Sequence, residues 1–170
     1  MSSIWGNKLK LSIFGESHGN AIGIVIDGLP CGFTIDFEKV KKDMKRRSPG
    51  INEFSTKRKE NDIPEILSGY FEDKTTGSPL CAIIKNNNAR SKDYSKIKDI
   101  MRPSQVDYTA FARYKGFSDY RGSGHFSGRI TAALVFAGSI AKQILSEKKI
   151  YTGALTRSEE RRVGKECRSR

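Results

Sequence analysis

Cysteine is scarce in this sequence, and Cys31, Cys81 and Cys167 are not spaced as metal ligands are. Their odd number argues against a disulfide framework and fits a reducing cytoplasm. Long apolar runs are also missing, because no segment reaches the roughly 18 apolar residues that a membrane-spanning helix needs. The N-terminus lacks the apolar core of a signal peptide. We therefore expect a cytoplasmic protein that binds neither a metal nor a membrane.

Acidic residues are few relative to basic ones. The 31 lysines and arginines exceed the 19 aspartates and glutamates, which gives a formal net charge of +12. This excess implies an anionic partner: nucleic acid, an acidic membrane surface or a small multiply charged substrate. The length of 170 residues suits one domain with one core, although the apolar content of 36% is low.

Glycine is concentrated in one stretch, which reads DYRGSGHFSGR at residues 119–129 and runs into an apolar helical segment. Free N–H groups at a helix N-terminus attract anions, and the helix dipole adds to that attraction. Arg121 and Arg129 could each bind phosphate or carboxylate oxygens through paired hydrogen bonds. The alternative is a glycine-rich turn with solvated arginines.

A hairpin is predicted near the N-terminus. Residues 8–14 and 22–26 alternate with a period of two, and GESHG at residues 15–19 reads as the turn between two strands. Glu16, Ser17 and His18 lie together at its tip. A single histidine is usually structural or merely exposed, but one flanked by glycine, glutamate and serine is a candidate acid or base.

Further along, Asp36 can cap a helix whose apolar stripe includes Val40 and Met44. Residues 65–71 and 79–85 read as strands joined by the turn DKTTGS. A strongly apolar helix is expected over residues 130–145 and buried on most of its sides. Two short sheets and one other clear helix are too little to cover it.

Aromatic residues recur at intervals of three after residue 107. Such spacing is typical of a helix face packed on a core, but it could also line the site of a flat, aromatic ligand. The residues are Tyr108, Phe111, Tyr114, Phe117 and Tyr120.

The last segment, TRSEERRVGKECRSR, is almost wholly polar. It also resembles a translated vector or adapter sequence. We expect a structured part at residues 1–155 and a disordered, non-native basic tail at residues 156–170.

Taken together, the motifs resemble the chorismate synthase family in their order and separation. They are GESHG (15–19), DGLPxG (27–32), RRxPG (46–50), ILSGxFExxTTG (66–77), RSxDYSxIKD (90–99), RPSxxDYTxxARYKGFxDYRG (102–122) and SGRxTA before the alanine-rich helix. The family chain is about twice as long, so the resemblance implies the N-terminal half of such a protein.

This resemblance implies a fold and a function. The fold is α+β, a β-α-β sandwich with helices packed between antiparallel sheets, assembled as a homotetramer. The activity is the 1,4-anti elimination of phosphate from 5-enolpyruvylshikimate 3-phosphate to give chorismate, in aromatic amino acid biosynthesis. Reduced FMN is the cofactor, and the resemblance leaves open whether NADPH reduces it. A substrate with one phosphate and two carboxylates agrees with the surplus of basic residues.

The family motifs also imply roles for individual residues. His18 matches the histidine proposed to protonate reduced flavin, and Ser17 lies on the substrate side. Arg47 matches an arginine on the substrate or NADP side, and Arg129 matches one directed at the substrate. The remaining matches form a flavin-contacting triplet, of which the last also faces substrate: His125, Phe126 and Ser127.

Two positions depart from the family pattern. Gln105 replaces a second catalytic histidine, and an amide cannot shuttle a proton at pH 7. Glu53 stands where many members carry arginine. A catalytically silent fragment is therefore one alternative, and a basic nucleic-acid-binding module is another. The enzyme is favoured over nucleic-acid binding because the cations concentrate in loops near His18.

Overall fold

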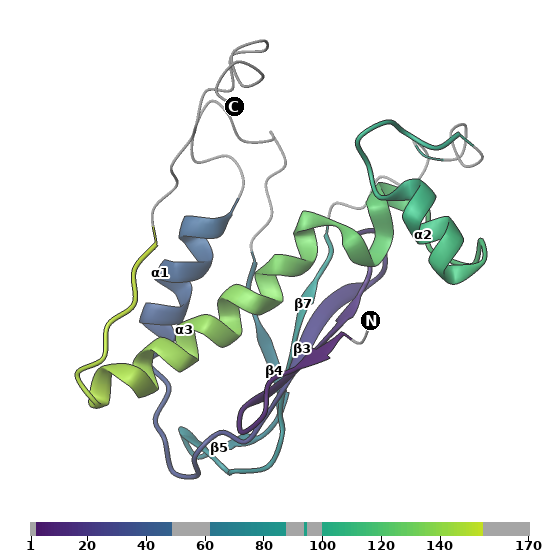
Figure 1. Ribbon diagram of the computed structural model, residues 1–170. Helices are drawn as coiled ribbons and strands as arrows, with labels where there is room; N and C mark the ends of the chain where they lie inside the picture. The colour runs from purple at the N-terminus through teal and green to yellow at the C-terminus, as the bar shows by residue number, and fades with distance from the viewer. Residues whose placement is uncertain (1–2, 49–61, 88–93, 95–99, 155–170) are drawn as a thin grey trace, which may run out of the picture.

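The computed structural model describes residues 3–48, 62–87, 94 and 100–154 (Figure 1). Its largest element is a five-stranded sheet in which all neighbouring strands are antiparallel. Across the sheet, the strands are β1 (Ile4–Trp5), β2 (Lys10–Gly15), β3 (Ala21–Asp27), β7 (Leu80–Lys85) and β4 (Glu65–Ser68). The predicted hairpin is confirmed, because β2 and β3 pair on either side of the GESHG turn.

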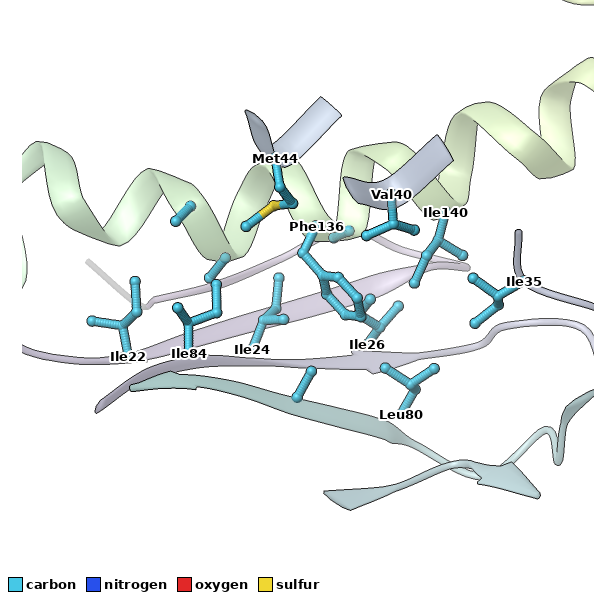
Figure 2. Packing of buried hydrophobic residues seen from close by; sticks show 14 of the residues in the cluster. Ile22, Ile24, Ile26, Ile35, Val40, Met44, Leu80, Ile84, Phe136 and Ile140 are labelled. Atoms are coloured by element: carbon cyan, nitrogen blue, oxygen red, sulfur yellow. The ribbon is translucent and has the colours of Figure 1, made fainter. Parts of the chain in front are cut away.

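The hydrophobic core lies between this sheet and two helices, α1 (Phe37–Arg47) and α3 (Thr131–Glu147), as Figure 2 shows. Alternation along β3 turns Ile22, Ile24 and Ile26 toward the helices, and all three are buried. Their cross-strand partners in β7 are Ile84, Ala82 and Leu80, which are buried as well. The helices cover them with Val40, Met44, Phe136 and Ile140.

The two helices are also joined by polar contacts at the start of α1. The Asp36 carboxylate caps α1 as predicted, accepting hydrogen bonds from the N–H groups of Glu38 and Lys39. The Asp36 N–H donates to Gln143 Oε1 at 2.8 Å, and Gln143 Nε2 donates to the Asp36 carbonyl at 3.1 Å. This reciprocal pair fixes the N-terminus of α1 against α3.

The strand predicted over residues 65–71 is wrong at its end. The chain bends at Gly69, whose φ of +80° suits glycine. Beyond the bend, β5 (Tyr70–Phe71) pairs with β6 (Lys74–Thr75) in a separate two-stranded sheet. The predicted turn DKTTGS therefore contributes a strand. The hairpin turn itself is formed by Glu72 and Asp73, both with positive φ.

The aromatic spacing does not mark a helix face against the core. Helix α2 (Asp107–Tyr114) ends where Lys115 and Gly116 adopt positive φ, so the later aromatics lie beyond it. Within α2, Ala110 is the buried residue. The aromatic side chains are all exposed, from 39% for Tyr114 to 92% for Phe117.

Helix α3 confirms the predicted helix over residues 130–145 and its burial on most sides. Gly138 and Lys142 lie on a narrow exposed stripe, whereas Phe136, Ala137 and Ile140 are buried. The fold class is α+β, as predicted. Within the described ranges, one sheet packs on α1 and α3, and the second sheet of the sandwich stays a prediction.

The 27-residue run Arg121–Glu147, which includes α3, is long and apolar enough to cross a membrane by length and composition alone, because an 18-residue window within it has a mean hydropathy of 1.2. The expectation that no segment is long enough was therefore too strong. This property alone is weak support for a membrane span, because the core helix of a globular domain has it too. Phe136 and Ile140 of α3 lie in the core against the sheet.

Phe136→Ala should lower the free energy of unfolding by about 3–5 kcal/mol, because it leaves a cavity in the core. Tyr108→Ala on α2 should change it by less than about 0.5 kcal/mol, since that ring is exposed. Urea denaturation followed by circular dichroism measures both. Equal losses would mean that α2 carries a core of its own.

Candidate active site

Ser17 and His18 are buried although they lie at the tip of a hairpin, with 1% and 9% of their surface exposed. They are covered by the glycine-rich segment η2 (Arg121–Phe126). The Ser17 N–H donates to the Gly124 carbonyl at 3.1 Å, and the Ser17 hydroxyl donates toward the Gly122 carbonyl at 3.1 Å. The turn and the glycine stretch, singled out separately in the sequence, thus form one site.

The hydroxyl of Ser17 orients the His18 ring. Its oxygen lies 3.0 Å from His18 Nδ1. When the hydroxyl donates its proton to a backbone carbonyl, its oxygen can accept a hydrogen bond from the Nδ1–H tautomer of His18. The neutral imidazole then has Nε2 as its basic nitrogen. Tyr94 packs edge-on against the ring, with centroids 4.9 Å apart.

Glycine is required at residue 122. Its φ is +56°, and a Cβ there would lie 2.3 Å from His18 Cε1 and 2.9 Å from Ser17 Oγ. The next residue, Ser123, also has a positive φ, which is uncommon for a residue with a side chain. The loop can therefore close over His18 only along this backbone path.

Two carboxylates near the site are held by arginines. Burial raises the pKa of Asp119, but hydrogen bonds from the Arg121 side chain and N–H outweigh it and keep the pKa below its ordinary value, with a further contribution from His18. A two-pronged hydrogen bond from Arg102 likewise lowers the pKa of Asp107. Arg121, expected to bind an external oxyanion, thus pairs with a carboxylate of the chain.

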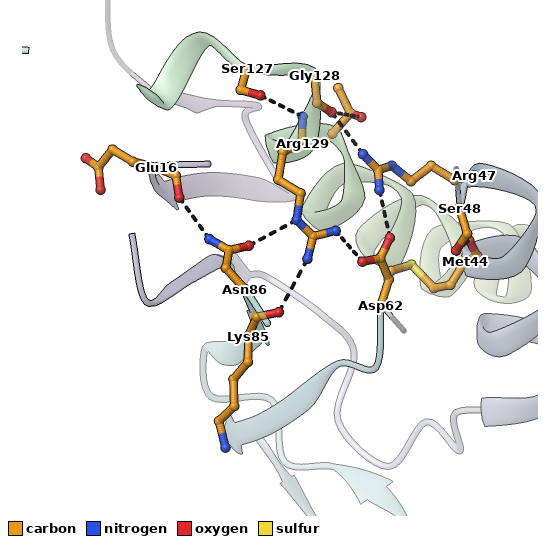
Figure 3. A network of polar contacts seen from close by, with 11 residues as sticks. Glu16, Met44, Arg47, Ser48, Asp62, Lys85, Asn86, Ser127, Gly128 and Arg129 are labelled. Atoms are coloured by element: carbon orange, nitrogen blue, oxygen red, sulfur yellow. Dashed lines mark hydrogen bonds and ion pairs between the residues drawn. The ribbon is translucent and has the colours of Figure 1, made fainter. Parts of the chain in front are cut away.

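Arg47 and Arg129 meet at a shared carboxylate, that of Asp62 (Figure 3). Arg47 donates to Asp62 Oδ2 at 2.7 Å, and Arg129 donates to Asp62 Oδ1. The Asp62 side chain is 1% exposed. We call these three residues the arginine cluster. It carries a formal charge of +1 and combines the end of α1, the segment before β4 and the short helix η3 (Gly128–Ile130).

The three residues predicted to contact flavin do not lie together: His125 and Phe126 line a pocket, and Ser127 does not. His125 Nδ1 donates to the Gly15 carbonyl at 2.9 Å, and its Nε2 lies 3.0 Å from the Ser3 hydroxyl. His125 and Phe126 line a pocket of about 440 Å³ together with Phe14, Tyr114 and Phe117. Ser127 is not among the residues that line it.

Ser127 instead shapes the start of η3. Its hydroxyl accepts a hydrogen bond from the Arg129 N–H at 3.2 Å, which caps this short helix. Ser127 therefore acts on the backbone that places Arg129.

Some site residues had no signal in the sequence. Asp62 lies far from Arg129 along the chain, in a polar stretch. Asn86 follows a strand and has no distinctive spacing, yet it contacts both Arg129 and the GESHG turn. Of the two departures from the family pattern, Gln105 is exposed before α2, and Glu53 lies outside the described residues. The predicted tail at residues 156–170 also lies outside them.

A family model described as chorismate synthase matches residues 9–166 of this chain. The chain belongs to the chorismate synthase family. The chorismate synthase of Christiangramia forsetii is 58% identical over 141 residues, which cover 83% of this chain and 40% of the relative. That of Sulfurimonas denitrificans is 54% identical over 143 residues, covering 84% of this chain and 40% of the relative.

A solved chorismate synthase structure is also similar, with a TM-score of 0.61 and 28% sequence identity. The match covers 85% of this chain and 36% of that structure. The chain thus spans about 40% of the length of the curated chorismate synthases that it matches.

Gly122→Ala should destabilise the fold by about 1–3 kcal/mol, because the residue must keep a positive φ while its methyl group meets His18. It should also shift the ¹⁵N resonances of the His18 ring. Gly153→Ala is the control, since nothing lies within 4 Å of a Cβ there. Unchanged His18 resonances in a folded Gly122→Ala protein would contradict the close packing of Gly122 against His18.

Asp62→Ala should cost about 3–5 kcal/mol of unfolding free energy, because it leaves two arginines without their buried counter-ion. Glu65→Ala removes the exposed partner of Lys85 and should cost less than about 1 kcal/mol. Urea denaturation of both variants is the measurement. Similar losses would show that burial adds nothing to the Asp62 contacts.

Proposed function

We propose that this chain forms part of a lyase that makes chorismate by eliminating phosphate from 5-enolpyruvylshikimate 3-phosphate, with reduced FMN as cofactor. Its place is the biosynthesis of aromatic amino acids in the cytoplasm. Membership of the family and identities of about 50% support this proposal. The structural observation that carries it is the buried Ser17–His18 pair, because a catalytic proton transfer needs an oriented, water-shielded imidazole.

In this proposal, His18 is the acid or base. Ser17 holds the Nδ1 side of the ring, so that Nε2 exchanges the proton. An imidazole suits this role because it changes protonation near neutral pH. The Gly122 carbonyl fixes the Ser17 hydroxyl in turn, and this sets the orientation of the ring through two successive hydrogen bonds.

The arginine cluster is the proposed binding site for the oxyanions of the substrate. In this proposal the N–H groups of Arg47 and Arg129 bind a phosphate or carboxylate, and Asp62 holds the two guanidinium groups next to each other. Arg129 is buried while Arg47 is partly exposed, with 19% of its side chain accessible. Arg47 is therefore the arginine that a ligand reaches first.

The pocket lined by Phe14, Tyr114, Phe117, His125 and Phe126 fits a flat aromatic ring system, because aromatic side chains form much of its wall. Its residues are those that would contact the flavin ring of FMN. When bound, reduced FMN supplies the electron density that assists cleavage of the carbon–oxygen bond. We further propose a homotetramer for the full-length protein.

The test uses a chimera in which this chain replaces the matching part of the Sulfurimonas denitrificans relative. His18→Gln should lower kcat by about 10²–10⁴-fold with little change in KM, because it removes a proton donor or acceptor and leaves the arginine cluster intact. Anaerobic assays with photoreduced FMN measure chorismate directly. Runs with NADPH as the only reductant decide whether it reduces the flavin.

The alternative is that this chain is catalytically inactive because Gln105 replaces a histidine. A chimera that shows no turnover, but gains turnover in its Gln105→His variant, would favour this alternative. A folded chimera without turnover in either form would contradict the proposal. An unchanged kcat in His18→Gln would remove His18 from the chemistry.

A further inference from the structure

Asn86 lies where β7 ends beside the GESHG turn. Its N–H donates to the Asn20 carbonyl at 3.0 Å, which prolongs the pairing of β7 with β3 by one residue. The backbone of Asn86 is thus fixed by the sheet. Its side chain begins from a defined position next to the turn.

The Asn86 side chain makes three hydrogen bonds to two parts of the site. Its Nδ2 donates to the carbonyl of Glu16 at 3.0 Å (Figure 3) and to that of Gly19 at 2.9 Å. Those carbonyls lie on either side of Ser17 and His18. Its Oδ1 accepts a hydrogen bond from Arg129 Nε at 3.0 Å. One amide therefore contacts both the turn that carries His18 and the arginine cluster.

The orientation of this amide is determined by its partners. Rotation by 180° would place its oxygen against two carbonyl oxygens and its NH₂ group against the Nε–H of Arg129. An aspartate of the same shape could still accept from Arg129, but it could not donate to the turn. An alanine could do neither.

Two further contacts of Arg129 hold its guanidinium group. It donates to Asp62 and, at 3.4 Å, to the carbonyl of Lys85, the residue before Asn86. Arg129 is thus attached to the same strand end through both residues. The guanidinium, Asn86 and the turn are thus joined by consecutive hydrogen bonds.

We propose that Asn86 is a positioning residue that couples the arginine cluster to the Ser17–His18 turn. Its amide sets the distance between the guanidinium that faces the substrate anion and the imidazole that handles the proton. This inference rests on the proposed function for its catalytic consequence. The coupling itself is a property of the chain and can be measured without activity.

The first experiment is nuclear magnetic resonance of the chain itself, with the Nε–H signal of Arg129 and the imidazole nitrogens of His18 followed across a pH titration. Asn86→Ala should shift the Arg129 signal and change the titration midpoint of His18. Asn86→Asp should keep the Arg129 contact but still change His18. Asn87→Asp, an equal charge change at the exposed next residue, is the control and should alter neither.

If Asn86→Ala does not fold, the His18 titration of Asn86→Asp alone tests the coupling. An unchanged His18 midpoint in a folded Asn86 variant overturns the coupling, whatever the activity of the protein.

The second experiment measures kcat and KM in the chimera. Loss of alignment between the two groups should lower kcat in Asn86→Ala on the order of 10²-fold and change KM much less. A loss confined to KM would overturn the positioning role. An inactive parent chimera would count against the proposed function, while the His18 titration would still decide the coupling.

Discussion

The carboxylate of Asp62 is the contact on which the site depends. It is almost fully buried and accepts from two arginines that come from separate segments of the chain, before and after it. A buried charge is costly unless it is paired, so the three segments that supply these residues must come together or the ionised groups must stay in water. The arginine cluster thus constrains the fold and also concentrates positive charge at the site. It places the end of α1 against the start of the helical segment that continues into α3.

The GESHG turn depends on a different kind of constraint. Much of its cover is backbone, since Gly122 and Gly124 approach Ser17 with their carbonyl groups. Glycine allows this because both residues have positive φ and face atoms that leave no room for a Cβ. The imidazole therefore lies between main-chain groups, which have no side-chain rotamers, and the ring of Tyr94.

The sequence predicted the elements that depend on local pattern. Alternation located Ile22, Ile24 and Ile26 on the core face of β3, and Asp36 was correctly assigned as a cap. The bend at Gly69 escaped prediction because the residues around it are ordinary strand formers. The aromatic spacing misled because its period continues past Tyr114, whereas the helix stops there. Local patterns cannot show which residues a tertiary contact will bury.

The same limit applies to the site. Ser17 and His18 attract attention because chemically capable side chains seldom gather at a glycine-flanked tip. No sequence pattern distinguishes Asp62 and Asn86, because their contacts with the arginines form only when segments distant in sequence meet. The family motifs supplied Arg47 and Arg129 but not the carboxylate between them.

The reciprocal bonds between Asp36 and Gln143 have a consequence for synthesis. The ribosome delivers the two residues in order, and 107 positions separate them. Helix α1 has its own cap and can begin to form early, but its partner for docking emerges only with α3. Until then, the isoleucine face of β3 has no helix α3 to cover it. A nascent chain thus leaves this apolar face without its α3 cover until α3 has been synthesised, and incompletely folded chains with exposed apolar surface are prone to aggregation.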